Sequence, residues 1–146
     1  MKKITYNDTI EFNLPNHWAT EEVDNIGVFY EQGDDTSTLR VELLVAKSPE
    51  PVDKNTSVEM LGVLSKGDDE ITTLEDGIAY KCYLEPVVED GESLIIHYWY
   101  VAHAVAPDIG RLVTFSFTTL SCNKGDDETL QIIGMLDHEI KSCRFL

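Results

Sequence analysis

The sequence predicts an α+β fold: an antiparallel β-sheet of six to seven strands with helices packed on its faces, built by residues 1–146 as one domain. Two long apolar-rich segments, Ser93–Ala106 and Arg111–Leu120, flank the turn-forming sequence Pro107–Gly110 and predict a central β-hairpin. Two other segments carry apolar residues at helical spacing. A chain of 146 residues also buries roughly two-thirds of its unfolded surface, which is enough for one core.

Three short strands are predicted before the first helix. Ile10–Leu14 alternates apolar and polar residues, and Pro15 ends it because proline cannot extend a hydrogen-bonded ladder. Gly27–Glu31 and Thr38–Lys47 follow, separated by a turn at residues 33–35. The alternation in Thr38–Lys47 places its apolar side chains on one face of the sheet.

Two helices are predicted. Thr56 is expected to be the N-cap of the first, Ser57–Lys66, with Glu59 completing a capping box. The second is Thr129–Cys143, which follows acidic residues that favour the positive end of a helix dipole. Its apolar stripe consists of Leu130, Ile133, Leu136, Ile140 and Cys143.

Two more strands are predicted between the helices. Ile71–Leu74 and Ile78–Val88 are joined by a tight turn at Asp76-Gly77. A second two-residue turn, Asp90-Gly91, joins the longer strand to the central hairpin, so that the strands form an antiparallel meander.

The turns of this meander set its register. The Asp90-Gly91 turn places Cys82 opposite Trp99, and the turn of the central hairpin is expected to place Ala106 opposite Arg111. One face then carries Tyr83, Ile96, Tyr98, Tyr100, Val113, Phe115 and Phe117. The other carries Ile78, Tyr80, Cys82, Leu84, His97, Trp99, Val101, His103, Thr114, Ser116 and Thr118. Both faces are too apolar to be left in water, so we expect helices or other segments to cover both.

The chain is strongly acidic, with 11 Lys and Arg against 27 Asp and Glu and a net charge of −16. Nucleic acid and anionic membranes would repel it. The charge favours either solubility alone or a basic protein partner, whose encounter it would accelerate. Several acidic turns at one end of the sheet would form a negative rim. The acidic clusters are Asp34-Asp35, Asp68-Asp69-Glu70, Glu89-Asp90-Glu92 and Asp126-Asp127-Glu128.

The cysteines and the N-terminal segment predict a cytoplasmic protein. Cys82, Cys122 and Cys143 are odd in number and lack C-x-x-C spacing, which argues against a disulfide framework and a zinc site. At the N-terminus, Asp8 and Glu11 come before any apolar run, whereas a signal peptide has an apolar region directly after its basic residues. The sequence contains no run of about eighteen apolar residues, so no membrane-spanning helix is predicted.

Candidate functional residues are few, and we expect no catalytic set, metal or cofactor. His97 and His103 lie six residues apart on one strand, about 20 Å, which is too far for one metal ion. His97 is expected to pack beside Trp99 and to hydrogen-bond a serine or threonine of the next strand. Trp18 is expected to close one end of the core, with a surface binding role as the alternative. The binding candidates are therefore His97, Trp99, His103 and Trp18.

The order of elements resembles a known fold group. The motif Phe12-x-Leu14-Pro15-x-x-Trp18, the meander Thr73–Leu120 and the C-terminal helix are similar to the α/β/α sandwich of the PsbP and Mog families, which includes bacterial DcrB-like proteins. The resemblance implies a non-enzymatic binding role: binding to a photosystem, to a small GTPase or to hydrophobic helices of a partner. It transfers no functional residue to a numbered position.

These observations lead to three hypotheses. The first is a bacterial-type binding protein, acting as an adaptor, chaperone or inhibitor of a basic protein. The second is a small-molecule-binding or enzymatic site on the sheet face that carries His97, Trp99 and His103. The third is a structural subunit of a larger assembly.

Overall fold

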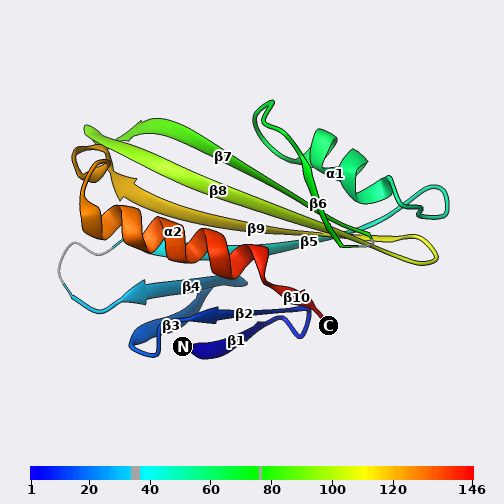
Figure 1. Ribbon diagram of the computed structural model, residues 1–146, viewed down its shortest axis with the longest axis horizontal. Coiled ribbons are helices and arrows are strands. Elements are labelled where there is room, and N and C mark those ends of the chain that lie inside the picture. The colour runs from blue at the N-terminus through cyan, green and yellow to red at the C-terminus, as the bar shows by residue number, and fades with distance from the viewer. Residues whose placement is uncertain (34–36, 76) are drawn as a thin grey trace.

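The computed structural model describes residues 1–33, 37–75 and 77–146 and confirms the predicted α+β class. A seven-stranded antiparallel sheet has the order β3-β4-β5-β9-β8-β7-β6, and a three-stranded sheet has the order β1-β2-β10 (Figure 1). The strands are β1 (Lys2–Tyr6), β2 (Ile10–Leu14), β3 (Trp18–Val23), β4 (Ile26–Glu31), β5 (Thr38–Lys47), β6 (Thr72–Glu75), β7 (Ile78–Glu89), β8 (Glu92–Val105), β9 (Ile109–Leu120) and β10 (Arg144–Phe145). The helices are α1 (Thr56–Leu64), α2 (Asp127–Lys141) and the short 3-10 helix η1 (Ser121–Asn123).

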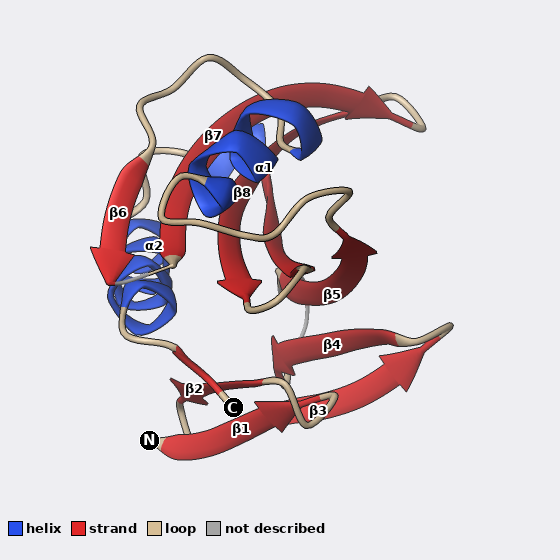
Figure 2. Cartoon of the chain, turned by 90° about the vertical axis from the view of Figure 1, so that its right-hand side faces the viewer, coloured by secondary structure: helices blue, strands red, loops and turns tan. Residues whose placement is uncertain are grey.

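The two faces of the large sheet are covered by different elements. The face that carries Trp99 packs against α2 and the small sheet and forms the larger core; we call it the α2 face. The opposite face, which carries Tyr100, packs against Leu61 of α1; we call it the α1 face. Two views place the small sheet beside β3 and β4, and α1 over β7 and β8 (Figures 1 and 2).

Aromatic rings join the small sheet to the large one. Phe12 of β2 meets Phe29 and Phe115 edge to face, with centroids 5.7 and 5.3 Å apart.

Within the large sheet, Trp18 of β3 stacks on Phe117 of β9 at 6.5 Å and is only 3% exposed. Each aromatic pair contributes about 0.5–1.5 kcal/mol beyond its buried area. Trp18 therefore closes this end of the core, as its spacing from Phe12 predicts.

The predicted register is right for one half of the meander and wrong for the other. Cys82 pairs with Trp99 as expected from the Asp90-Gly91 turn. Arg111, however, pairs with His103, three residues before Ala106. The ladder continues through Gly110 to Ile109, so the loop between β8 and β9 is shorter than the sequence suggested. A side chain at Gly110 would not fit, because its Cβ atom would lie 2.7 Å from the sulfur of Met60.

This correction changes the composition of both sheet faces. A shift by an odd number of residues exchanges the faces of a strand. Val113, Phe115 and Phe117 therefore lie on the α2 face, whereas Thr114, Ser116 and Thr118 join the α1 face. The α1 face is consequently less apolar than predicted, and one nine-residue helix covers part of it.

Element ends also differ from the sequence predictions. Helix α1 begins at Thr56 with Asn55 as N-cap and no side-chain capping bond, so the predicted capping box is wrong. The Thr56 hydroxyl instead accepts a hydrogen bond from the Asp53 N–H at 2.9 Å. Helix α2 begins at Asp127 and ends at Lys141, two residues earlier than expected at each end. Strands β1, β3 and β10 were not predicted.

Two of the acidic turns meet at one end of the large sheet. The hydroxyls of Ser93 and Ser121 lie 2.9 Å apart, which joins the β7–β8 turn to the segment that leads into α2. The clusters Glu89-Asp90-Glu92 and Asp126-Asp127-Glu128 therefore share this end, whereas residues 68–70 lie between α1 and β6. The predicted turn at Asp34-Asp35 and residue Asp76 of the Asp76-Gly77 turn lie outside the described residues.

Candidate functional site

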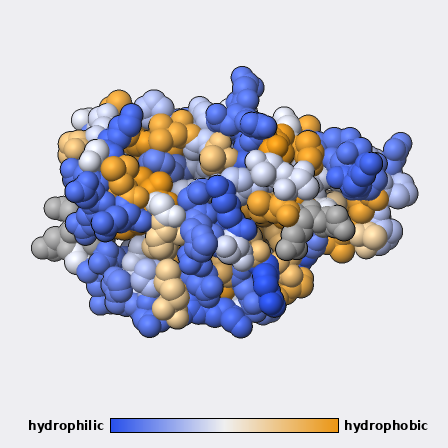
Figure 3. All heavy atoms as spheres, in the orientation of Figure 1, coloured by the Kyte–Doolittle hydropathy of each residue, from blue (hydrophilic) through white to orange (hydrophobic). Residues whose placement is uncertain are grey.

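A groove of about 480 Å³ runs between helix α2 and the β7–β8 edge of the sheet. We call it the α2–β7 groove. It lies over the region where Figure 3 shows hydrophobic surface on β7 and β8 above the start of α2. Its lining residues are Asp69, Cys82, Tyr83, Leu84, His97, Tyr98, Trp99, Leu130, Ile133, Gly134 and Asp137.

Two features of the fold leave this groove open. Strand β6 pairs with only the first three residues of β7, so within the described part of the chain β7 has no outer neighbour strand from Lys81 onward. On the other wall, α2 carries Gly134, where a Cβ atom would meet nothing within 4 Å. A short edge strand and a helical glycine together make a gap that side chains do not fill.

The walls of the groove are apolar and the floor is aromatic. Leu84 of β7 and Leu130 of α2 line the groove and are 43% and 53% exposed. On the floor, the rings of His97 and Trp99 stack with centroids 6.2 Å apart and planes at 24°. The position of Cys82 on the Trp99 face of the predicted sheet favours a small core residue, but in the structure Cys82 is exposed at this site, so that prediction is wrong.

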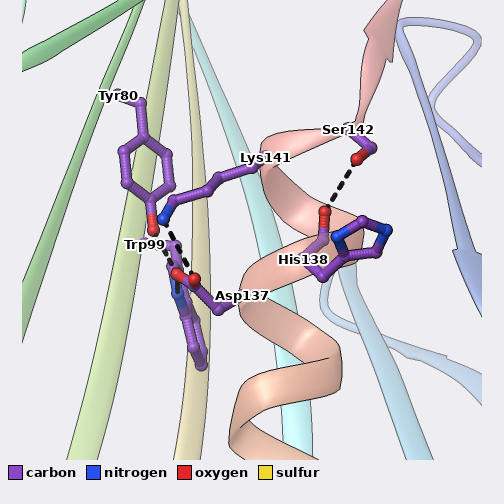
Figure 4. A network of polar contacts seen from close by, with 6 residues as sticks. All are labelled: Tyr80, Trp99, Asp137, His138, Lys141 and Ser142. Carbon is purple, nitrogen blue, oxygen red and sulfur yellow. Dashed lines mark hydrogen bonds and ion pairs between the residues drawn. The ribbon is translucent and has the colours of Figure 1, made fainter.

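Asp137 ties the floor of the groove to its helical wall (Figure 4). Its Oδ1 accepts hydrogen bonds from the Tyr80 hydroxyl at 2.6 Å and from the Trp99 Nε1–H at 3.1 Å. Its Oδ2 lies 3.0 Å from the Lys141 ammonium. Burial alone would raise the pKa of this carboxyl, but the hydrogen bonds from Tyr80, Lys141 and Trp99 outweigh burial and hold it below its ordinary value. Asp137 is therefore ionised at neutral pH, and both of its carboxylate oxygens have partners within the protein.

His97 offers hydrogen bonds that the protein does not use. Burial, helped by the nearby Lys124 charge, lowers the pKa of His97, so the imidazole is neutral at pH 7. Among the described residues neither ring nitrogen has a hydrogen-bond partner, and the bond predicted to a serine or threonine is not formed. A neutral imidazole has one donor and one acceptor. The groove thus combines an apolar slot with one unengaged polar ring.

His103 belongs to a different cluster. Its Nδ1 accepts a hydrogen bond from Arg111 Nη2 at 2.7 Å, and its ring lies 4.6 Å from that of Phe145. Arg111 Nη1 also donates to the Leu146 carbonyl at 3.2 Å. Burial and the Arg111 charge lower the pKa of His103. This cluster attaches the last residues to the sheet and is remote from the α2–β7 groove.

Trp18 lines another hollow, of about 550 Å³, at the acidic end of the sheet. Glu31, Asp126, Asp127 and Glu128 surround it. The structure therefore brings together only two of the four predicted candidates, His97 and Trp99.

Two important groove residues, Gly134 and Asp137, were not singled out from the sequence, whereas Leu84 was correctly placed on the face of His97 and Trp99. One signal could have found the site. Glycine in a helix interior costs about 1 kcal/mol relative to alanine, so Gly134 next to apolar Ile133 indicates a helix surface that needs space.

In the described part of the chain, no group of three or more His, Cys, Asp or Glu side chains could hold a metal ion. No helix among residues 1–33, 37–75 and 77–146 is long and apolar enough to cross a membrane.

Comparisons with known proteins identify the fold. No protein-family model matches the sequence, and no curated protein matches it. Among solved structures, the chain is similar to LpqN, which is involved in cell envelope biogenesis of Mycobacterium tuberculosis, with a TM-score of 0.64 and 15% identity over 93% of this chain and 82% of that one. It is also similar to a protein from Bacteroides thetaiotaomicron VPI-5482, with a TM-score of 0.62 and 15% identity over 99% of this chain and 48% of that one. Likeness at this identity concerns the fold alone.

Proposed function

We propose that the protein is a binding module for a basic protein partner, and that apolar side chains of the partner enter the α2–β7 groove. The observation that carries the proposal is the groove itself: an open apolar slot of about 480 Å³ on a chain with a net charge of −16. Such a site offers buried contacts for affinity and a field that guides a cationic partner.

Carboxylates lie close to the groove on two sides. Asp69 lines it, with Asp68 and Glu70 as its exposed neighbours in the chain. Asp127 and Glu128 form the first turn of α2, which borders the Trp18 hollow and comes less than one turn before the groove residue Leu130. A partner segment with apolar side chains flanked by lysine or arginine would match this arrangement. Its charges would remain at the solvated rim while its apolar groups enter the groove.

The fold supports a binding role by analogy. The resemblance to PsbP, Mog and DcrB-like proteins implies partner binding, as an adaptor, chaperone or inhibitor. Our proposal places this protein in the cytoplasm, although the similar LpqN is described as acting in cell envelope biogenesis. Cell fractionation tests the location: recovery in the envelope fraction would contradict it.

The test uses a synthetic amphipathic peptide of leucine and lysine and its charge-reversed counterpart of leucine and glutamate. We expect the lysine peptide to bind and its affinity to fall as salt rises, because surface charges are screened. Gly134→Leu fills the groove and should abolish binding. The matched control is Gly62→Leu, which also enlarges an exposed helical glycine with nothing within 4 Å, but in α1. Binding that survives Gly134→Leu, or that ignores both charge and salt, would refute the proposal.

A small-molecule ligand is the second candidate, because the unengaged His97 imidazole lies in a cavity within the usual range of about 300–1,000 Å³. The dependence of binding on salt concentration distinguishes a basic protein partner from a small-molecule ligand. Binding of an uncharged small molecule would be lost in Gly134→Leu but would not weaken as the salt concentration rises.

A further inference from the structure

We infer that the partner enters the α2–β7 groove with a tryptophan or tyrosine side chain flanked by basic residues. The inference rests on the proposed function and specifies the group that the groove receives. Three observations lead to it: the shape of the floor, the bare helical wall and the free polar atoms of His97.

The accessible part of the floor is the half-buried His97 ring. Trp99 is only 3% exposed and lies behind it, with ring centroids 6.2 Å apart and planes at 24°. The hydrogen bond from Trp99 to Asp137 fixes this second ring in place. An aromatic side chain prefers to pack on another ring in an offset-stacked or edge-to-face arrangement. A floor that is already fixed loses little entropy when a ring packs on His97.

The opposite wall leaves room for a ring. Gly134 has no side chain, and a Cβ atom there would meet nothing within 4 Å. Ile133 and Leu130 flank this gap on the helix, and Leu84 borders it on the strand. A planar side chain can thus lie between the backbone of α2 and the stacked floor, with apolar groups along its edges.

His97 adds a preference among aromatic side chains. Neither of its ring nitrogens has a partner among the residues that the structure describes, so the neutral ring can accept from a tryptophan N–H or a tyrosine hydroxyl. Phenylalanine would leave this capacity unused. We therefore expect tryptophan and tyrosine to bind more tightly than phenylalanine.

Backbone pairing with the free edge of β7 is a poorer alternative. Pro86 lies within β7, paired with Ile95 of β8. Proline is tolerated in an edge strand when its missing N–H points away from the sheet, so the free edge of β7 lacks a donor at this position. An added strand would miss that hydrogen bond, which favours recognition through a side chain.

The experiment compares five peptides with four lysines around a central tryptophan, tyrosine, phenylalanine, leucine or alanine. Binding is measured by NMR titration of the protein, observing the Trp99 indole N–H and the Gly134 amide. We expect tryptophan and tyrosine to bind about two- to tenfold more tightly than leucine, as one added aromatic contact predicts. Phenylalanine should be intermediate.

Two variants and one control test the geometry. Gly134→Leu should remove the aromatic preference, and Gly62→Leu should keep it. His97→Phe retains a ring on the floor but should make tryptophan, tyrosine and phenylalanine equivalent. Circular dichroism confirms that each variant is folded. Salt-sensitive binding in which leucine equals tryptophan and tyrosine, with alanine weaker, would overturn the inference while leaving the proposed function intact. Absence of binding by the five peptides and by the leucine–lysine peptide would overturn both.

Discussion

The Trp99 indole donates a hydrogen bond to the Asp137 carboxylate at 3.1 Å, and this bond joins the centre of the large sheet to α2. The same carboxylate accepts from Tyr80, so one acidic side chain holds two aromatic residues of neighbouring strands (Figure 4). The groove floor is therefore built by a polar contact between helix and sheet. Its geometry depends on Asp137 remaining ionised.

Asp137→Asn should destabilise the fold. The amide keeps the size of the side chain but loses the charge that strengthens the bonds from Tyr80 and Trp99. Hydrogen bonds to charged groups contribute about 1.5–3 kcal/mol, and partial exposure of Asp137 reduces this to about 1–2 kcal/mol of unfolding free energy. Urea unfolding measures it. Lys141→Met, which breaks the exposed i,i+4 ion pair and removes the ammonium 5.3 Å above the Tyr80 ring, should cost less, below about 1 kcal/mol; an equal loss would contradict the central role of Asp137.

Stability should fall on mild acidification. Burial lowers the pKa of both His97 and His103 below the ordinary 6.5, with further lowering by Lys124 and Arg111 respectively. The unfolded chain then binds protons more readily than the folded one, so stability is full above pH 6.5 and is lost as pH falls below it. Thermal unfolding between pH 7.5 and about 5 follows the loss. In the double variant with His97→Gln and His103→Gln, stability should depend less steeply on pH. An unchanged dependence would show that other titrating groups cause the loss.

Arg111→Met should release the C-terminal residues from the sheet. The variant loses the bonds to His103 and to the Leu146 carbonyl, and the packing over Phe145 at 5.0 Å. We expect faster hydrogen exchange at the Leu146 amide, which donates to the Thr9 carbonyl at 2.7 Å. Unfolding free energy should fall by about 1–3 kcal/mol. Arg144→Met, which removes a 75% exposed side chain 3.6 Å from Glu11, is the control and should cost less than about 1 kcal/mol.

Two glycine substitutions should have opposite effects. Gly134→Ala adds a methyl group into open space within α2 and should stabilise the protein by about 0.5–1 kcal/mol. Gly67→Ala should destabilise it, because Gly67 has a φ of +81° and its added Cβ would collide with the Tyr83 ring. Differential scanning calorimetry measures both. A destabilising Gly134→Ala would mean that this part of the groove is filled.

The fold was predictable where local signals were unambiguous. The two-residue Asp90-Gly91 turn fixed the β7–β8 register, and the alternation of β5 gave its bounds, Thr38–Lys47, correctly. The β8–β9 register was wrong because the sequence does not show how far the ladder continues into Pro107–Gly110. Strand β10 is two residues long and is held by pairing with β2, so it has no pattern of its own.

The candidate site was predictable only in part. His97 and Trp99 share a strand face in any register of β8, because alternate residues of a strand point the same way. The groove above them depends on tertiary features: the early end of β6, the approach of α2 and the missing side chain at Gly134. None of these follows from periodicity. His103 and Trp18 proved to belong to other clusters for the same reason.

The most direct test of the binding groove is the reactivity of the Cys82 thiol in a Cys122→Ser variant. Cys82 is exposed in the groove, and burial raises the pKa of Cys143 to about 12, so a maleimide at pH 7 reports on Cys82. With saturating leucine–lysine peptide, the labelling rate should fall several-fold. An unchanged rate, measured while the peptide is bound, would place the binding site elsewhere and contradict the account.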